Sequence, residues 1–107
     1  MMVLSMVSVI ALASVQSAAA NNSRTELITC LQQAAEQAKG DKLPAGAFTT
    51  FASERCVTAA TSLKAALVSF DVKNKVPRKE AQSDAQGQVD EFVQMAAEKY
   101  SAKAPKP

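Results

Sequence analysis

The stretch from Phe48 to Asp71 constrains the fold most, because its apolar residues recur at steps of three and four. At about 100° per residue, this spacing places them on one side of an α-helix. The members of this stripe are Phe48, Ala52, Cys56, Ala59, Leu63, Ala66, Leu67 and Phe70. The stripe is wide enough to bury against two neighbours, so the sequence predicts a helix over 46–71 that is packed by the segments before and after it.

Two further helices are predicted on either side. Ser23 and Glu26 match a capping box, and Gly40 follows a stripe that begins at Leu27, so the sequence predicts a helix over 23–39 with Gly40 as its C-cap. Pro77 opens a third predicted helix over 77–101. Its expected core stripe consists of Ala81, Ala85, Val89, Phe92, Ala96 and Tyr100.

Cys30 and Cys56 lie almost symmetrically about the connector between the first two predicted helices. An antiparallel hairpin brings the two residues level with each other, at a separation that suits a disulfide. The sequence therefore predicts a Cys30–Cys56 disulfide that joins helices one and two. The alternative is a pair of free thiols with redox chemistry, but neither cysteine has the C-x-x-C spacing that such chemistry usually requires.

The first twenty residues read as a signal peptide. Residues 1–15 are apolar apart from three serines and carry no charged side chain, and Ala18, Ala19 and Ala20 supply small residues before a cleavage site. The apolar run is shorter than the ~20 residues of a membrane span. We expect cleavage after Ala20, no transmembrane span in the mature chain, and a periplasmic or secreted protein. The alternative is a retained N-terminal helix or anchor.

These features together predict an all-α fold. The signal peptide occupies 1–20, an antiparallel three-helix up-down-up arrangement fills a single domain over 21–101, and residues 102–107 form a disordered tail. The chain of 107 residues is long enough for only one small core, which a disulfide helps to stabilise.

Several kinds of chemistry are disfavoured. Histidine is absent, which removes the commonest general base and metal ligand. The net charge of +2 comes without a series of stacking aromatics, so nucleic acid is not an expected partner. Asp84, Glu91 and Glu98 repeat every seven residues, and the ~10 Å between successive members is too long to share a metal ion. We expect no enzyme, no cofactor and no metal.

A basic and apolar patch follows the second predicted helix. We call it the turn patch; its members are Leu67, Phe70, Val72, Lys73, Lys75, Val76, Arg78 and Lys79. Because the first predicted helix is shorter than the second, we expect it to leave an apolar pocket here, surrounded by cations. That combination favours an anionic amphiphile or an acidic amphipathic helix. The alternatives are a solvated loop and a dimer that buries the patch.

The Cys30–Cys56 hairpin, the following Ala66-Leu67-Val68-Ser69-Phe70-Asp71-Val72-Lys73-Asn74 segment and the Pro-led third helix carry a resemblance. They resemble small exported two-cysteine helical proteins of alphaproteobacteria, a group that implies no particular activity. We therefore expect a non-catalytic interaction module of the cell envelope that binds anionic lipid, polysaccharide or an acidic protein. The alternative is a structural or accessory subunit, or a homodimer, that docks on another exported protein.

Overall fold

The protein is all-helical in the part that the structure describes. The computed structural model describes the backbone of residues 2–103 and the side chains of residues 18–103. Within this range the chain forms four α-helices and no strand. The helices are α1 (Met2–Gly40), α2 (Ala45–Arg55), α3 (Val57–Lys73) and α4 (Arg78–Lys103).

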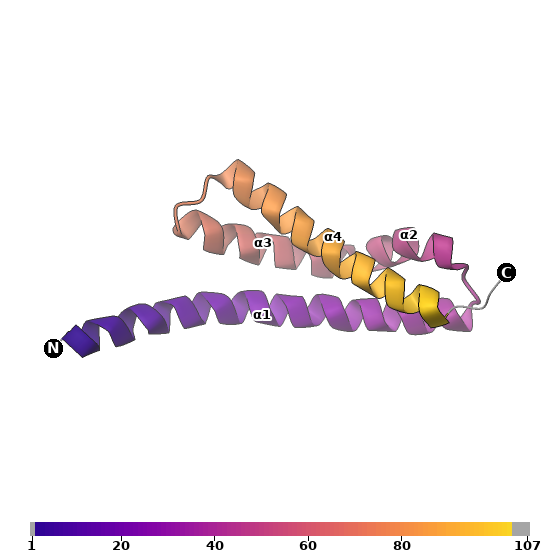
Figure 1. Cartoon of the computed structure of the whole chain (residues 1–107), viewed down its shortest axis with the longest axis horizontal. Coiled ribbons are helices and arrows are strands. Elements are labelled where there is room, and N and C mark those ends of the chain that lie inside the picture. The colour runs from indigo at the N-terminus through magenta and orange to yellow at the C-terminus, as the bar shows by residue number, and fades with distance from the viewer. Residues whose placement is uncertain (1, 104–107) are drawn as a thin grey trace.

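The helices run back and forth along the long axis of the molecule (Figure 1). The longest helix, α1, lies along one side; α2 and α3 return in the opposite direction, and α4 runs forward again across them. Two hydrogen bonds join α4 to α1 and its following turn: Arg24 Nη2 donates to Gln88 Oε1 at 3.4 Å, and Tyr100 Oη donates to the carbonyl oxygen of Leu43. The predicted all-α class is confirmed, with α1 and α4 parallel.

The helix predicted over 46–71 is divided in two at Cys56. Cys56 has φ −104° and ψ 20°, outside the helical region, and it ends α2 and precedes α3. The helical hydrogen bonds continue across the break, since the N–H of Cys56 donates to the carbonyl oxygen of Ala52 and the N–H of Ala60 donates to the carbonyl oxygen of Cys56. No proline or glycine lies between residues 47 and 73, so local sequence does not account for the break. It occurs at the residue that carries the disulfide.

The first predicted helix does not begin at Ser23. The ribbon of α1 is continuous from Met2 to Gly40, and neither proline nor glycine precedes Gly40. The alanines at 18–20 are strong helix formers, so the turns before and after them join. Because Ser23 lies inside a helix, its capping box has no free N-terminus to cap. Whether residues 1–20 are removed stays a prediction.

The other predicted boundaries are nearer to those observed. The third predicted helix corresponds to α4, but this helix begins one residue after Pro77 and continues to Lys103. The tail expected from residue 102 therefore starts too early, because Ala102 and Lys103 extend the last turn. Residues 104–107 lie outside the described part of the chain.

Both turns between antiparallel helices have the same construction. Lys42 and Lys75 adopt positive φ angles of 56° and 68°. In each turn the N–H of the next residue donates to the carbonyl oxygen five residues earlier. These hydrogen bonds run from Leu43 to Ala38 and from Val76 to Asp71. This pattern is the Schellman motif, and it places the left-handed residue at Lys42 rather than at Gly40, so the predicted Gly40 C-cap is wrong.

The core is made from all four helices and is rich in alanine. In the second predicted stripe Phe48, Ala52, Cys56, Leu63 and Leu67 are buried, but Ala59, Ala66 and Phe70 are only half-buried. In α4 Val93 is buried, although it was not in the predicted stripe, and Phe92 and Ala96 are only partly buried. Fully or nearly fully buried members include Leu27, Leu31, Ala34, Ala38, Phe48, Ala52, Cys56, Leu63 and Tyr100. Of the helices that the structure describes, none combines the length and the apolar character needed to cross a bilayer.

Candidate functional site

The disulfide joins α1 to the junction between α2 and α3. Cys30 and Cys56 have an S–S distance of 2.10 Å and a Cα–Cα distance of 5.8 Å, which confirms the predicted pairing. Cys56 is buried, whereas Cys30 is half-buried at the edge of α1. The Cys30 sulfur also lies 3.9 Å from the carbonyl oxygen of Arg55, the last residue of α2. The disulfide therefore packs against the backbone at the helix break.

A groove with a volume of about 420 Å³ runs between α1 and α4. We call it the apolar groove; its walls are formed by Ile28, Leu31, Gln32, Ala35, Glu36 and Lys39 of α1 and by Phe92, Met95, Ala96, Lys99, Tyr100 and Lys103 of α4. The members recur at three- and four-residue steps, so each helix presents one stripe to the groove. Small side chains at Ala35 and Ala96 leave space between the two helices.

The apolar residues of this groove are unusually accessible. Met95 is 48% exposed and Ile28 is 39% exposed, and both belong to the three exposed large hydrophobic residues found in the part of the chain with described side chains. Leu31 and Tyr100, by contrast, are buried and form its floor. The groove therefore offers apolar surface to a ligand without opening the core.

The charges of the apolar groove lie toward one end. Lys39 is in the last turn of α1, and Lys99 and Lys103 are in the final two turns of α4. Since α1 and α4 are parallel, these exposed amines come to the same end of the molecule, against the single carboxylate of Glu36. Cations near helix C-termini also offset the negative ends of the helix dipoles.

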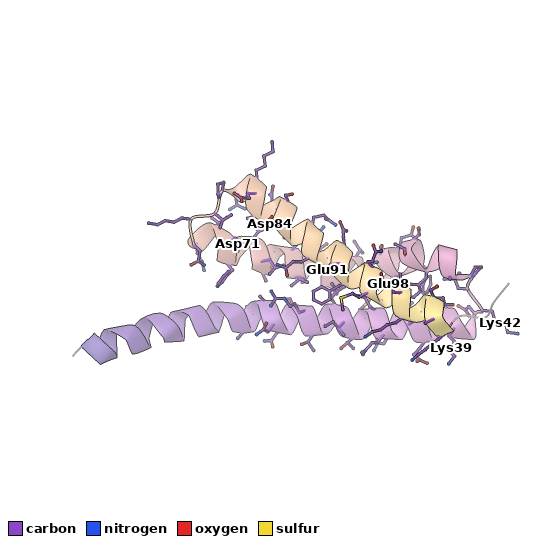
Figure 2. All side chains as sticks on the ribbon, in the orientation of Figure 1. Lys39, Lys42, Asp71, Asp84, Glu91 and Glu98 are labelled. Atoms are coloured by element: carbon purple, nitrogen blue, oxygen red, sulfur yellow. A yellow bond between two sulfur atoms is a disulfide. The ribbon has the colours of Figure 1, made fainter. Side chains whose placement is uncertain are left out.

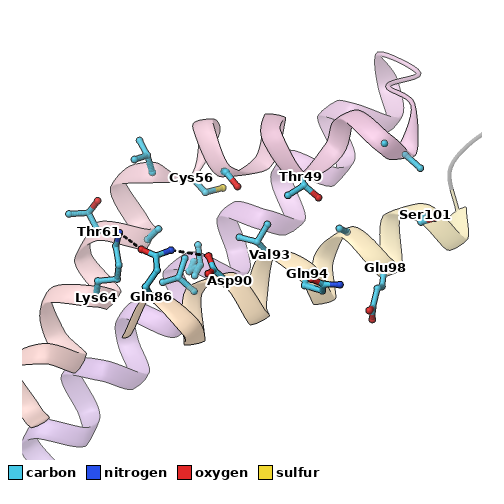
Figure 3. Close-up of a pocket in the computed structure, with 18 residues that line it drawn as sticks. Thr49, Cys56, Thr61, Lys64, Gln86, Asp90, Val93, Gln94, Glu98 and Ser101 are labelled. Carbon is cyan, nitrogen blue, oxygen red and sulfur yellow. Dashed lines mark hydrogen bonds between the residues drawn. The ribbon is translucent and has the colours of Figure 1, made fainter. Parts of the chain in front are cut away.

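A second groove, which we call the polar groove, lies on the other side of α4 against α2 and α3. Its volume is about 770 Å³, and its lining includes the buried residues Cys56, Val89 and Val93. Figure 3 shows Cys56 and Val93 among the residues that line it. Its sides carry hydroxyl, amide and charged groups. Lys64 Nζ donates to Gln86 Oε1 at 3.0 Å, and Gln86 Nε2 donates to Asp90 Oδ1 at 2.8 Å, so this amine and one carboxylate already have partners.

The turn patch lies at the opposite end of the molecule from the lysines of the apolar groove. Its four cations, Lys73, Lys75, Arg78 and Lys79, are exposed around the α3–α4 turn. Its apolar residues are less available: Leu67 is only 6% exposed and belongs to the core, while Phe70, Val72 and Val76 are half-buried. Neither groove is lined by a residue of this patch. The four cations therefore lie together as expected, but neither the apolar groove nor the polar groove lies at the turn patch, where an apolar pocket was expected.

The acidic residues of α4 are spread along the helix. Asp84, Glu91 and Glu98 are exposed and follow one another along α4, toward the end of the molecule where Lys39 and Lys42 lie (Figure 2). Among the side chains that the structure describes, no three His, Cys, Asp or Glu residues form a group that could hold a metal ion.

Sequence reasoning missed the apolar groove although its residues were visible. Phe92 and Ala96 were assigned to the core stripe of the third predicted helix, and Lys99 and Lys103 were not part of any predicted site. The available signal was the exposed side of two parallel helices, each with alanine midway and lysine at its end. No protein-family model, curated protein or solved structure matches this chain.

Proposed function

We propose that this protein is a non-catalytic helical binding module of the cell envelope that holds an anionic amphiphile in the apolar groove. The observation that carries the proposal is the pairing of exposed apolar side chains, Ile28 and Met95, with three lysines at one end of the same groove. A pocket of a few hundred Å³ with apolar walls and a few convergent polar groups is typical of small-ligand sites.

The groove matches the dimensions of a single acyl chain. Ile28 and Lys39 are eleven residues apart on α1, which corresponds to ~16 Å of helix. An acyl chain lying along this length contacts Leu31, Ala35 and Ala96, and its head group reaches the lysines. Each buried methylene contributes about 0.8 kcal/mol, and each exposed charge pair contributes about 0.2–1 kcal/mol.

The proposed compartment follows from the apolar leader and the disulfide. Disulfides form and persist in oxidising compartments, and the leader has the features of an export signal. We therefore place the module in the periplasm or outside the cell.

The test compares two amphiphiles with twelve-carbon chains and head groups of opposite charge. Dodecanoate and dodecyltrimethylammonium are titrated below their micellar concentrations, with emission of Tyr100 as the readout, because this residue lines the groove and is the only tyrosine of a chain without tryptophan. We expect dodecanoate to bind about tenfold more tightly or better, with a difference that shrinks as salt screens the lysines. Equal affinities for the two probes contradict an anionic preference.

A substitution that fills the groove tests its location. Ala96→Leu adds bulk midway along the apolar groove and should lower the affinity for dodecanoate about tenfold, since displacing two buried methylenes costs about 1.6 kcal/mol. The matched control is Ala65→Leu, which adds the same side chain at an exposed position of α3 outside both grooves. Unchanged affinity in Ala96→Leu contradicts the proposed site.

A second candidate function is supported by the polar groove. It has a larger volume than the apolar groove, has apolar residues between polar sides, and is lined by Val57, which is 57% exposed. A helix of another exported protein, or of a second copy, fits such a surface. Stoichiometric co-purification of one partner, lost in Val57→Asp, supports this accessory role; a monomer with no partner contradicts it.

A further inference from the structure

The Cys30–Cys56 disulfide joins α1, which forms one wall of the apolar groove, to the junction between α2 and α3. Cys30 lies on α1 between Ile28 and Leu31, which both line the groove. Cys56 is the C-cap of α2. The disulfide therefore ties one wall of the groove directly to the end of α2.

The other end of α2 holds the opposite wall. Phe48 of α2 stacks on Tyr100 of α4, with ring centroids 4.5 Å apart and planes inclined by 13°. Tyr100 also donates its hydroxyl hydrogen to the carbonyl oxygen of Leu43, in the turn that leads to α2. Because Tyr100 lines the groove, the position of α2 decides where this wall stands.

Resting on the groove proposed above, we infer that the disulfide is a positioning element for the binding site: it maintains the break at Cys56, which directs α2 and Phe48 against Tyr100. The periodicity of residues 46–71 favours one continuous helix, whereas the structure breaks this helix only at the tethered residue. Without the tether, α2 and α3 join, Phe48 leaves Tyr100, and the groove loses its ordered end.

The reduction step is chemically simple. A dithiol such as dithiothreitol passes two electrons and two protons to the S–S bond. The bond breaks to leave two thiols, and the reagent is oxidised to its own cyclic disulfide. The groove is then predicted to bind ligand well only in the oxidised protein, so that redox state regulates the site.

The experiment reads Tyr100 and ligand binding separately. Acrylamide quenching of Tyr100 is measured without ligand in the oxidised chain, in the reduced chain and in Cys30→Ser/Cys56→Ser; dodecanoate affinity is then measured in each. We expect quenching to rise on loss of the disulfide, because Tyr100 is only 5% exposed in the oxidised protein. Affinity should fall by about fivefold or more, the lower range of coupling between sites.

Two variants keep the test decisive if the chain without the disulfide does not fold. Phe48→Leu retains the disulfide but removes the stacked ring, and it should also expose Tyr100 and weaken dodecanoate binding. Leu67→Val makes a small cavity in the core near the α3–α4 turn, and it should change neither the quenching of Tyr100 nor the affinity for dodecanoate. This control separates positioning of the groove from a general loss of stability. If Tyr100 stays protected in a folded reduced chain and in Phe48→Leu, the inference is wrong.

The two proposals fail in different ways. If the oxidised protein does not bind dodecanoate, the proposed function is wrong, yet Tyr100 quenching still decides whether the disulfide positions α2. If dodecanoate binds equally well to the oxidised and reduced chains, the groove proposal stands and the redox regulation is overturned.

Discussion

The two basic ends of this molecule have similar charge but different surroundings. At the end where α1 and α4 finish, Lys39, Lys99 and Lys103 border a groove with exposed apolar side chains. At the end where α3 turns into α4, the cations surround Phe70 and Val76, which are half-buried. The comparison shows that a cluster of lysines becomes a candidate site only where the packing leaves apolar surface beside it.

The difference arises from how each end uses its apolar residues. In the α3–α4 turn, Val76 is the residue that follows the left-handed Lys75, and such a residue usually packs back against the preceding helix. In the apolar groove, α1 and α4 contribute Ala35 and Ala96 to the lining, and these side chains are too short to close the gap. Local turn chemistry closes one surface, and small side chains leave the other open.

Removing the disulfide should have the largest effect on stability and should affect the two ends unequally. Cys30→Ser/Cys56→Ser opens a loop with a sequence separation of 26 residues, which corresponds to about 3.5 kcal/mol in the chain-entropy model. Chemical denaturation measures the total decrease in the free energy of unfolding. Hydrogen exchange should show the greater loss of protection in α2 and the start of the apolar groove, and an equal loss at the α3–α4 turn contradicts the comparison.

Tyr100→Phe tests the hydrogen bond that anchors the groove end. This substitution removes the bond to Leu43 and keeps the ring stacked on Phe48, so it should cost about 1 kcal/mol in the free energy of unfolding. Asn74→Ala removes the corresponding bond at the other end, from Asn74 Nδ2 to the carbonyl oxygen of Phe70 at 2.8 Å. Because Asn74 is exposed, its loss should cost less. A larger loss for Asn74→Ala reverses the expected order.

The smallest predicted effect is a gain in stability from both turns. Lys42→Gly and Lys75→Gly relieve the penalty of a left-handed conformation at residues with a Cβ atom, and each should stabilise the protein by about 0.5–1 kcal/mol. Gly46→Ala at an exposed position of α2 is a helix-propensity control with a different mechanism. Thermal melts compare the variants; destabilisation by either lysine substitution contradicts the common construction of the two turns.

Much of the helical pattern could be predicted from the sequence, because apolar spacing reports helix faces directly. Leu27, Leu63 and Ala85 were all assigned to the core and are buried. The Cys30–Cys56 pairing followed from the symmetry of the two cysteines about a turn. These features depend on local periodicity and on the geometry of one hairpin.

The remaining features depend on tertiary packing or on turn chemistry. The break at Cys56 has no local cause, so periodicity could not reveal it. The matching Asp41-Lys42-Leu43-Pro44 and Asn74-Lys75-Val76-Pro77 segments could have revealed the shared turn, but lysine seldom adopts positive φ. The apolar groove required knowledge that α1 and α4 are parallel neighbours.

The central claim is that the ligand binds in the apolar groove and not at the turn patch. The most direct test removes the same number of positive charges from one end of the molecule or from the other. One variant carries Lys39→Gln, Lys99→Gln and Lys103→Gln at the apolar groove, and its control carries Lys73→Gln, Lys75→Gln and Lys79→Gln at the turn patch, so both lose three positive charges. We predict about tenfold weaker dodecanoate binding for the groove variant, from the loss of three exposed charge interactions, and unchanged binding for the control. Loss of binding in the turn variant alone would move the site to the turn patch and contradict this account.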